Sequence, residues 1–262
     1  MQIFPLIIPG SWLVFPDEKN KDLLTNLLMH IENLFFEANA ALICYKIESQ
    51  KLIQRHAGIR DEIKIKSDRV RKQEIENDIL QERNVGGAAS SADVIFEVES
   101  TFRNEKWANG NIPNSILNAC VFIHAKSFLY SFDMIGKIVR VLEGIPGAPK
   151  GTYDKIKKTF PDLIGLRDTI QHREDRSRGL GRVKGKMVAI KAQSVDVGGL
   201  KFGAGSIVLN CLNNDNYGST MADGTYGQIE ISEATLENMR VIIQELLELF
   251  QWDGSKTYLP HS

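Results

Sequence analysis

The chain has 262 residues, which is enough for one large domain or two modest ones. Apolar residues make up 43% and charged residues 25% of the sequence, both ordinary values for a globular protein. The formal net charge of −1 excludes a field over the whole chain that would attract nucleic acid or a membrane, so any anion site has to be local.

The cysteines and the N-terminal stretch predict a cytoplasmic protein. Cys44, Cys120 and Cys211 are widely spaced, which is typical of reduced thiols. Residues 1–16 are apolar but lack a basic leader and contain three prolines, so they predict short strands or a packed arm and not a signal peptide. No apolar run approaches the ~20 residues of a membrane span, and no membrane segment is expected.

Helical spacing of apolar residues dominates the first half of the chain. It predicts a long amphipathic helix from Asp17 to about Ile53 and a second long helix from Pro113 to Leu142. The strongly charged stretch Arg60–Asn84 predicts an exposed helix with a thin apolar stripe, or alternatively an arm that faces RNA or a partner. Residues 92–108 are expected to be helical, with a strand at residues 94–100 as the alternative.

The pattern changes after Gly181. Short alternating runs predict a small antiparallel sheet of three to five strands over Lys186–Ile231, in which Asp223-Gly224 is a hairpin turn. This sheet is expected to pack on the helices, with the N-terminal arm as a strand partner. Ser232 is expected to cap a final helix that ends at Asp253-Gly254.

Together these elements predict a mainly α fold in a single domain, residues 1–262. A bundle of four to five helices occupies residues 17–181 plus 232–253. A small antiparallel β-meander, residues 182–231, is inserted before the C-terminal helix. A meander of this size is marginal alone, which is why it is expected to pack on the bundle.

One helix carries an unusual density of charge. Pro161 is expected to begin a helix that reaches Arg176, with Asp168 and His172 four residues apart and therefore neighbours. The Asp168 carboxylate could accept a hydrogen bond from one imidazole nitrogen and aim the other outward. Arg167 lies about 140° from His172 around the helix. The two could act on one phosphate only if the helix distorts or a second copy contributes.

The basic residues after His172 extend this segment. Arg173, Arg176, Arg178 and Arg182 form a run opposed only by Glu174 and Asp175. The run could guide an RNA backbone towards the site, or it could be a solvated loop that leads into the sheet. No pair of cysteines or histidines has metal-ligand spacing, so no metal is expected.

The segment LRDTIQHREDR, residues 166–176, resembles the signature of the HEPN superfamily (higher eukaryotes and prokaryotes nucleotide-binding). That signature is an Arg, a polar residue and then a His after four to six positions, near the end of a helix in a small bundle. Arg167, Asp168 and His172 match it in this order, and residues 174–176 look like those of uncharacterised bacterial members. Asp in place of the commoner Asn after the Arg is a departure, and the β-meander lies outside the family pattern.

This resemblance implies a HEPN-like bundle and a metal-independent endoribonuclease, of a toxin or defence type, that cleaves RNA through its 2′-OH. His172 would be the acid/base, Arg167 the phosphate clamp and Asp168 the residue that orients the imidazole, with Gln171 and Asp175 in support. Expected partners are RNA or a nucleotide, a second copy that completes the cleft, and an antitoxin. The alternative is a non-catalytic module that binds a nucleotide, RNA or a protein. No cofactor is expected.

Overall fold

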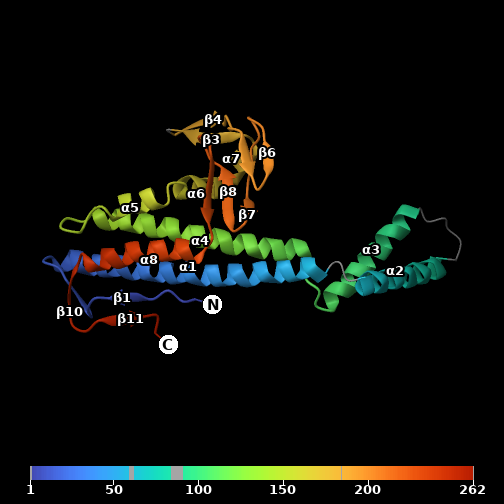
Figure 1. The fold of residues 1–262 in the computed structure, drawn as a ribbon, viewed down its shortest axis with the longest axis horizontal. Coiled ribbons are helices and arrows are strands. Elements are labelled where there is room, and N and C mark those ends of the chain that lie inside the picture. The colour runs from blue at the N-terminus through green and yellow to red at the C-terminus, as the bar shows by residue number, and fades with distance from the viewer. Residues whose placement is uncertain (1, 59–61, 84–90, 184, 262) are drawn as a thin grey trace. The chain divides into compact units, whose positions relative to one another are not determined.

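The computed structural model describes residues 2–58, 62–83, 91–183 and 185–261. The described chain is mainly helical, with small antiparallel strand pairs towards the C-terminus (Figure 1). Its contacts form two compact units. Unit 1 comprises Met1–Tyr45 with Phe122–Ser262, and unit 2 comprises Lys46–Val121. The predicted mainly α class is confirmed, and the single domain stays a prediction.

Unit 1 contains a helical bundle. Its main helices are the first part of α1 (Glu18–Gly58), the last part of α4 (Asn114–Glu143), α5 (Thr152–Thr159) and α8 (Glu233–Glu248) (Figure 1). Apolar residues spaced three or four apart bury one face of each long helix. The fully buried side chains include Leu24, Ile31, Phe35, Phe128, Phe132, Ile135, Leu236 and Met239. The periodicity therefore predicted these helices correctly.

The predicted end of the last helix is wrong. Ser232 caps α8 as expected, because its Oγ accepts from Thr235 N at 3.2 Å. The helix stops at Glu248, however, and the chain continues as β10 (Gln251–Asp253) and β11 (Thr257–Leu259). These strands pair antiparallel with β2 (Trp12–Val14) and β1 (Leu6–Ile8). The N-terminal arm thus pairs with the C-terminal strands and not with the meander, contrary to expectation.

The β region between the last two helices forms three small antiparallel sheets. The first hairpin is β3 (Leu180–Val183) with β4 (Lys186–Ala189), and the second is β5 (Val195–Val197) with β6 (Leu200–Phe202). A three-stranded sheet follows, in the order β7 (Cys211–Asn213), β8 (Asn216–Thr220) and β9 (Tyr226–Glu230). The antiparallel character and the turn at Asp223-Gly224 are confirmed; the division into separate sheets was not predicted.

Several contacts attach the three-stranded sheet to the helices of unit 1, among them the following three. The Tyr45 hydroxyl on α1 donates to Asp215 Oδ1 at 2.6 Å, in the turn between β7 and β8. The ring of Tyr217 on β8 lies edge-on to Phe122 of α4, with centroids 6.5 Å apart. Gln228 N on β9 donates to Asp162 Oδ2 at 2.9 Å, just before α6 (Leu163–Gln171). The predicted packing of the sheet on the bundle is therefore confirmed.

In unit 2, α2 (Glu62–Arg83) and α3 (Ser91–Ala108) form a helical pair. Its core contains Ile75, Ile79, Val94, Val98 and Phe102. Ion pairs flank this narrow core, among them Arg71 Nη2 to Glu105 Oε1 at 2.7 Å. Residues 92–108 are helical, so the strand alternative is wrong. The ends of the predicted charged helix, Arg60 and Asn84, lie outside the described residues.

Within the described chain, one helical stretch has the length and apolar content that a membrane span requires, Glu18–Arg55 of α1. In the molecule, 39% of its most apolar window is buried. The core helix of a globular protein passes the same test, so this finding does not establish a membrane span. The expected absence of a membrane segment and the cytoplasmic location stay predictions.

The turn between β8 and β9 offers a test of the sheet. Gly224 has φ +89°, and a Cβ there would lie 2.2 Å from the Lys191 carbonyl oxygen. We expect Gly224→Ala to destabilise the protein by about 3 kcal/mol, because left-handed strain and a backbone clash add. Gly205→Ala is the matched control, since Gly205 has φ +88° and open space around it, and it should cost about 1 kcal/mol. Equal losses in urea unfolding would contradict the clash.

Candidate functional site

The segment that the sequence singled out is two helices and not one. α6 ends at Gln171, and α7 (Arg173–Ser177) begins after His172, whose φ of −110° and ψ of 41° break the helix. Arg176 makes a contact across the break. Its Nη2 donates to Asp168 Oδ2, so the side chain that follows the break is tied to the helix that precedes it.

Arg167 is buried against α4. Its side chain is 9% exposed, and its guanidinium carbon lies 4.8 Å from the centre of the Tyr130 ring. Nε is 3.8 Å from Oδ2 of Asp133, a buried carboxylate that also lies 2.6 Å from Lys137 Nζ. In the amide orientation that satisfies both groups, Gln171 accepts from Nη1 and Nη2 at 3.1 and 2.6 Å. The predicted phosphate clamp is therefore occupied by protein groups in this conformation.

Arg176 is buried more deeply still, with 1% of the residue exposed. Besides Asp168, it donates from Nη1 to the Leu180 carbonyl oxygen at 2.9 Å and so fastens α7 to the start of β3. A guanidinium in this position is not accessible to an RNA backbone, contrary to the sequence expectation. Its role in the structure is to hold the turn that follows His172.

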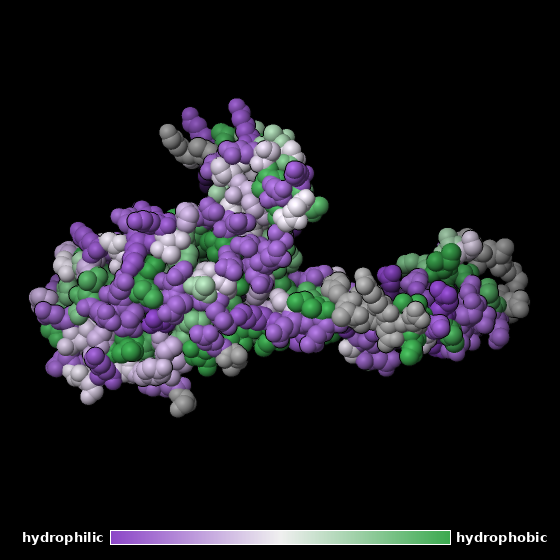
Figure 2. Space-filling view, viewed as in Figure 1, coloured by the Kyte–Doolittle hydropathy of each residue, from purple (hydrophilic) through white to green (hydrophobic). Residues whose placement is uncertain are grey.

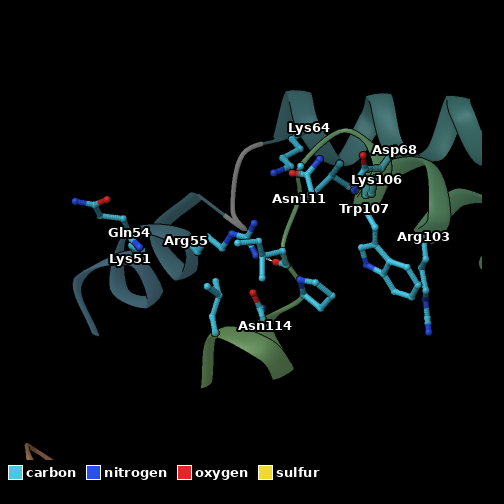
Figure 3. Close-up of a pocket in the computed structure, with 15 residues that line it drawn as sticks. Lys51, Gln54, Arg55, Lys64, Asp68, Arg103, Lys106, Trp107, Asn111 and Asn114 are labelled. Atoms are coloured by element: carbon cyan, nitrogen blue, oxygen red, sulfur yellow. Dashed lines mark hydrogen bonds and ion pairs between the residues drawn. The ribbon is translucent and has the colours of Figure 1, made fainter. Parts of the chain in front are cut away.

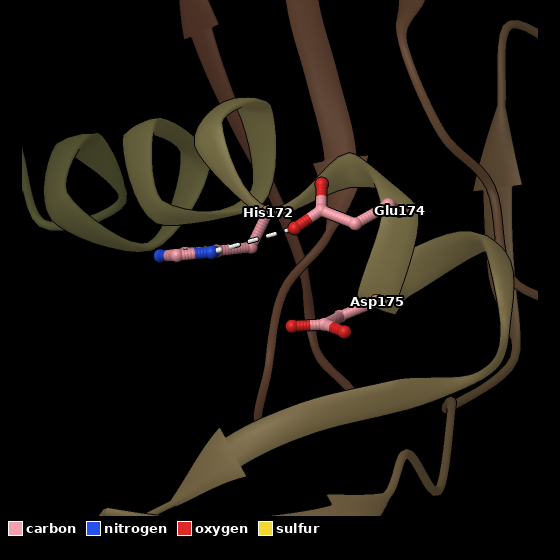
Figure 4. A group of neighbouring side chains, drawn as sticks. All are labelled: His172, Glu174 and Asp175. Atoms are coloured by element: carbon pink, nitrogen blue, oxygen red, sulfur yellow. Dashed lines mark ion pairs between the residues drawn. The ribbon is translucent and has the colours of Figure 1, made fainter.

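His172 stays accessible, with 43% of its side chain exposed. Nε2 lies 3.7 Å from Asp168 Oδ1. Nδ1 lies 3.8 Å from Glu174 Oε1 (Figure 4). Both distances are longer than a direct hydrogen bond. The predicted neighbourhood of Asp168 and His172 is present, although Asp168 accepts a hydrogen bond from Arg176 and not from the imidazole. Arg167 faces α4, while His172 faces these carboxylates, so the two do not share a contact.

A group of possible metal ligands includes the same imidazole. Ligand atoms of His172, Glu174 and Asp175 all lie within 4.8 Å of one another (Figure 4). An imidazole with two carboxylates is a donor set that Zn²⁺ or Mn²⁺ accepts. Asp175 is already paired with the exposed Arg178, however, through its Oδ1. No metal was expected here from the sequence, and this group was not predicted.

The next residue, Arg173, is exposed and lies with Lys126 of α4 around a small hollow of about 20 Å³. Tyr217, Thr169, Asn210 and Ser219 also line it. Burial, and then repulsion from Arg173, lower the pKa of Lys126. Burial raises the pKa of Tyr217 to about 12, and Arg173 opposes this rise. Among the described residues neither cation has an ion pair with a carboxylate, so the two form an uncompensated pair.

Of the other predicted residues, Arg178 is exposed but held by Asp175, and Arg182 is exposed on β3. Gln171 is exposed and faces Arg167. The structure thus places these residues in two groups. Arg167 lies with Gln171 beside α4, and His172 lies with Asp168 and Asp175. Arg173 joins a third group, with Lys126, that the sequence did not predict.

No protein-family model, curated protein or solved structure matches this chain. The resemblance to the HEPN superfamily therefore rests on the residues of the Arg167–His172 segment alone. What the site can do has to be argued from its own geometry.

Sequence reasoning missed Lys126. Lys126 is the one Lys or Arg in the stretch 114–134. A lone lysine on an amphipathic helix is usually a solvated side chain, and nothing local indicates that an arginine far along the chain comes to lie beside it. Asp133 was missed for the same reason, because Arg167, which lies near it, is on another helix.

Asp133 gives the test of the buried arginine. Asp133→Asn removes the carboxylate nearest to a guanidinium that is almost fully buried. We expect a loss of about 2–4 kcal/mol, because breaking a buried pair leaves a charge uncompensated. Asp154→Asn is the control, since Asp154 is exposed and paired with Lys157 at 2.7 Å, and it should cost under about 1 kcal/mol. Similar losses in urea unfolding would show that Arg167 does not depend on Asp133.

Proposed function

We propose that the protein binds the phosphate of an RNA or a nucleotide at Lys126 and Arg173. The observation that carries this proposal is the approach of two cations that have no acidic partner among the described residues. Two like charges held together raise each other's energy, and an anion between them removes that repulsion. Burial and then repulsion from Arg173 lower the pKa of Lys126, and a bound phosphate would oppose the part that comes from Arg173.

The surroundings of the pair suit a phosphate oxygen. The hydroxyl of Tyr217 and the polar side chains of Asn210 and Ser219 line the same hollow, although these three already bond to one another or to the backbone. Arginine offers planar paired donors, and lysine adds a point charge. The hollow itself is too small for a nucleotide, so the base and sugar would lie outside it.

RNA cleavage is the second proposed function, and the exposed imidazole of His172 favours it. His172 immediately precedes Arg173, so a phosphate held by Arg173 brings RNA close to an acid/base group. The 2′-oxygen would attack phosphorus and lose its proton to the imidazole, while the 5′-oxygen leaves and is protonated. The products are a 2′,3′-cyclic phosphate and a 5′-OH.

This second proposal differs in its phosphate-binding residues from the HEPN-like scheme that the sequence suggested. Arg173 and Lys126 stabilise the charge of the transition state in place of the buried Arg167. The homodimer, the antitoxin partner and the toxin or defence role remain part of the proposal and rest on the resemblance. A non-catalytic module remains the alternative if binding occurs without cleavage.

Binding is tested with the double variant Lys126→Ala/Arg173→Ala. We expect its affinity for a short labelled RNA, measured by fluorescence anisotropy, to fall at least about 10-fold, because two charge-assisted contacts are lost. Lys158→Ala is the control, since that lysine is exposed on α5 and does not line this hollow. An unchanged affinity in the double variant would place RNA elsewhere or exclude this site.

Cleavage is tested with His172→Ala in excess EDTA. If the protein cleaves RNA, this variant should be about 10²–10⁴-fold slower, with its binding affinity retained. His30→Ala, an exposed histidine on α1, should cleave at the wild-type rate. Cleavage that EDTA abolishes and Mn²⁺ or Zn²⁺ restores would contradict the metal-independent scheme and point to the group His172, Glu174 and Asp175.

A further inference from the structure

Unit 2 contains a pocket of about 820 Å³ that the proposed function does not use. Its walls come from the end of α1, the start of α2, the end of α3 and the loop before α4 (Figure 3). Five cations and one carboxylate line it, and one indole, that of Trp107, is exposed at its edge. The charged lining residues are Lys51, Arg55, Lys64, Arg103, Lys106 and Asp68.

The positive charge of this pocket is only partly compensated. Asp68 pairs with Lys106, Glu48 lies 2.6 Å from Lys51, and Glu99 lies 3.6 Å from Arg103. Within the described part of the chain, Lys64 has no ion pair, and Arg55 donates to the Ile112 carbonyl oxygen and to no carboxylate. Two positive charges therefore remain without a carboxylate in a pocket that is large enough for a nucleotide.

The outer face of α3 continues the pocket with aromatic side chains. Phe96 is 76% exposed and Trp107 50% exposed, and at 100° per residue the two lie within about 20° of one another on the helix. Arg103 lies between them on the same face, and Figure 3 shows its side chain extending beside the indole of Trp107. Figure 2 shows hydrophobic patches between hydrophilic ones on this unit. Eleven residues of helix separate the two rings by roughly 16 Å.

Charge on α2 is divided between its two halves. Residues 64–72 contain five cations and one acid, while residues 74–82 contain four acids and no cation. The basic half begins at Lys64, so it borders the pocket, and the acidic half lies further along the helix. A polyanion would be attracted to one end of unit 2 only, although the chain as a whole carries a net charge of −1.

We propose that the unit 2 pocket and the adjoining face of α3 bind a single-stranded nucleic acid. One base stacks on Trp107 and another on Phe96, while Lys64, Arg55 and Arg103 contact the backbone phosphates. Proteins that bind single-stranded nucleic acid without sequence preference combine aromatic rings, on which bases stack, with cations that contact the backbone. The spacing of the two rings corresponds to about two to three nucleotides of an extended strand.

A protein partner would also cover exposed aromatic rings, but the pocket favours nucleic acid. A protein interface excludes unpaired charge from its centre, and here Lys64 and Arg55 line the same pocket as the indole. The inference is carried by unit 2 alone and does not rest on Lys126, Arg173 or His172. RNA binding at one site can therefore fail while binding at the other stands.

The test measures binding of fluorescein-labelled single-stranded oligo(U) and oligo(dT) to the full-length protein by anisotropy, at several salt concentrations. We expect Trp107→Ala to weaken binding roughly 5- to 100-fold, and Trp107→Phe to stay within a few-fold of wild type because the stacking ring remains. Lys64→Glu should weaken binding and lower the slope of log affinity against log salt by about 0.7 or more, because a phosphate contact is lost.

Two controls match these changes. Lys158→Glu makes the same charge change on the exposed face of α5, and Leu80→Ala removes an exposed apolar side chain from the acidic half of α2; both should bind as wild type does. Binding that Lys126→Ala/Arg173→Ala abolishes and Trp107→Ala leaves unchanged would overturn the inference and keep the proposed function. It is also overturned if no strand binds, or if Trp107→Ala changes only the oligomeric state in sedimentation.

Discussion

The burial of Arg167 between α4 and α6 is the constraint on which the arrangement of unit 1 depends. A guanidinium that is almost closed off from water needs a carboxylate, a ring and an amide around it, and Asp133, Tyr130 and Gln171 supply them. These contacts fix α6 along α4 and thereby bring Arg173 to Lys126. The residue that the sequence predicted as the phosphate clamp thus holds the framework, and the exposed Arg173 takes that role in the proposed function.

The features that the sequence predicted are those encoded within one element. Apolar periodicity identified the helices, and local turn and cap signals at Asp223-Gly224 and Ser232 were correct. The break at His172 was not predictable in this way, because the contacts of Arg176 that accompany it, with Asp168 and the Leu180 carbonyl oxygen, join different elements. β10 was read as helix because its pairing with β2 joins opposite ends of the chain. Such contacts leave no periodic pattern.

The two proposed binding surfaces depend on the same physical condition, which is cationic charge that the protein itself does not neutralise. In unit 1 two cations, Lys126 and Arg173, share a narrow hollow beside a tyrosine. In unit 2 the cations line a wide pocket with an exposed indole. The first geometry suits one phosphate group, while the second suits a base together with its phosphates. A near-neutral chain can contain both because acidic residues are gathered elsewhere, as in the second half of α2.

The break between α6 and α7 also gives His172 an unusual mechanical position. His172 is both the C-cap of α6 and the N-cap of α7, so its φ and ψ set the angle between the two helices. Its imidazole is attached at the pivot, with Asp168 on one arm and Glu174 on the other. The angle between the two helices therefore sets how far the imidazole lies from Asp168 of α6 and from Glu174 of α7.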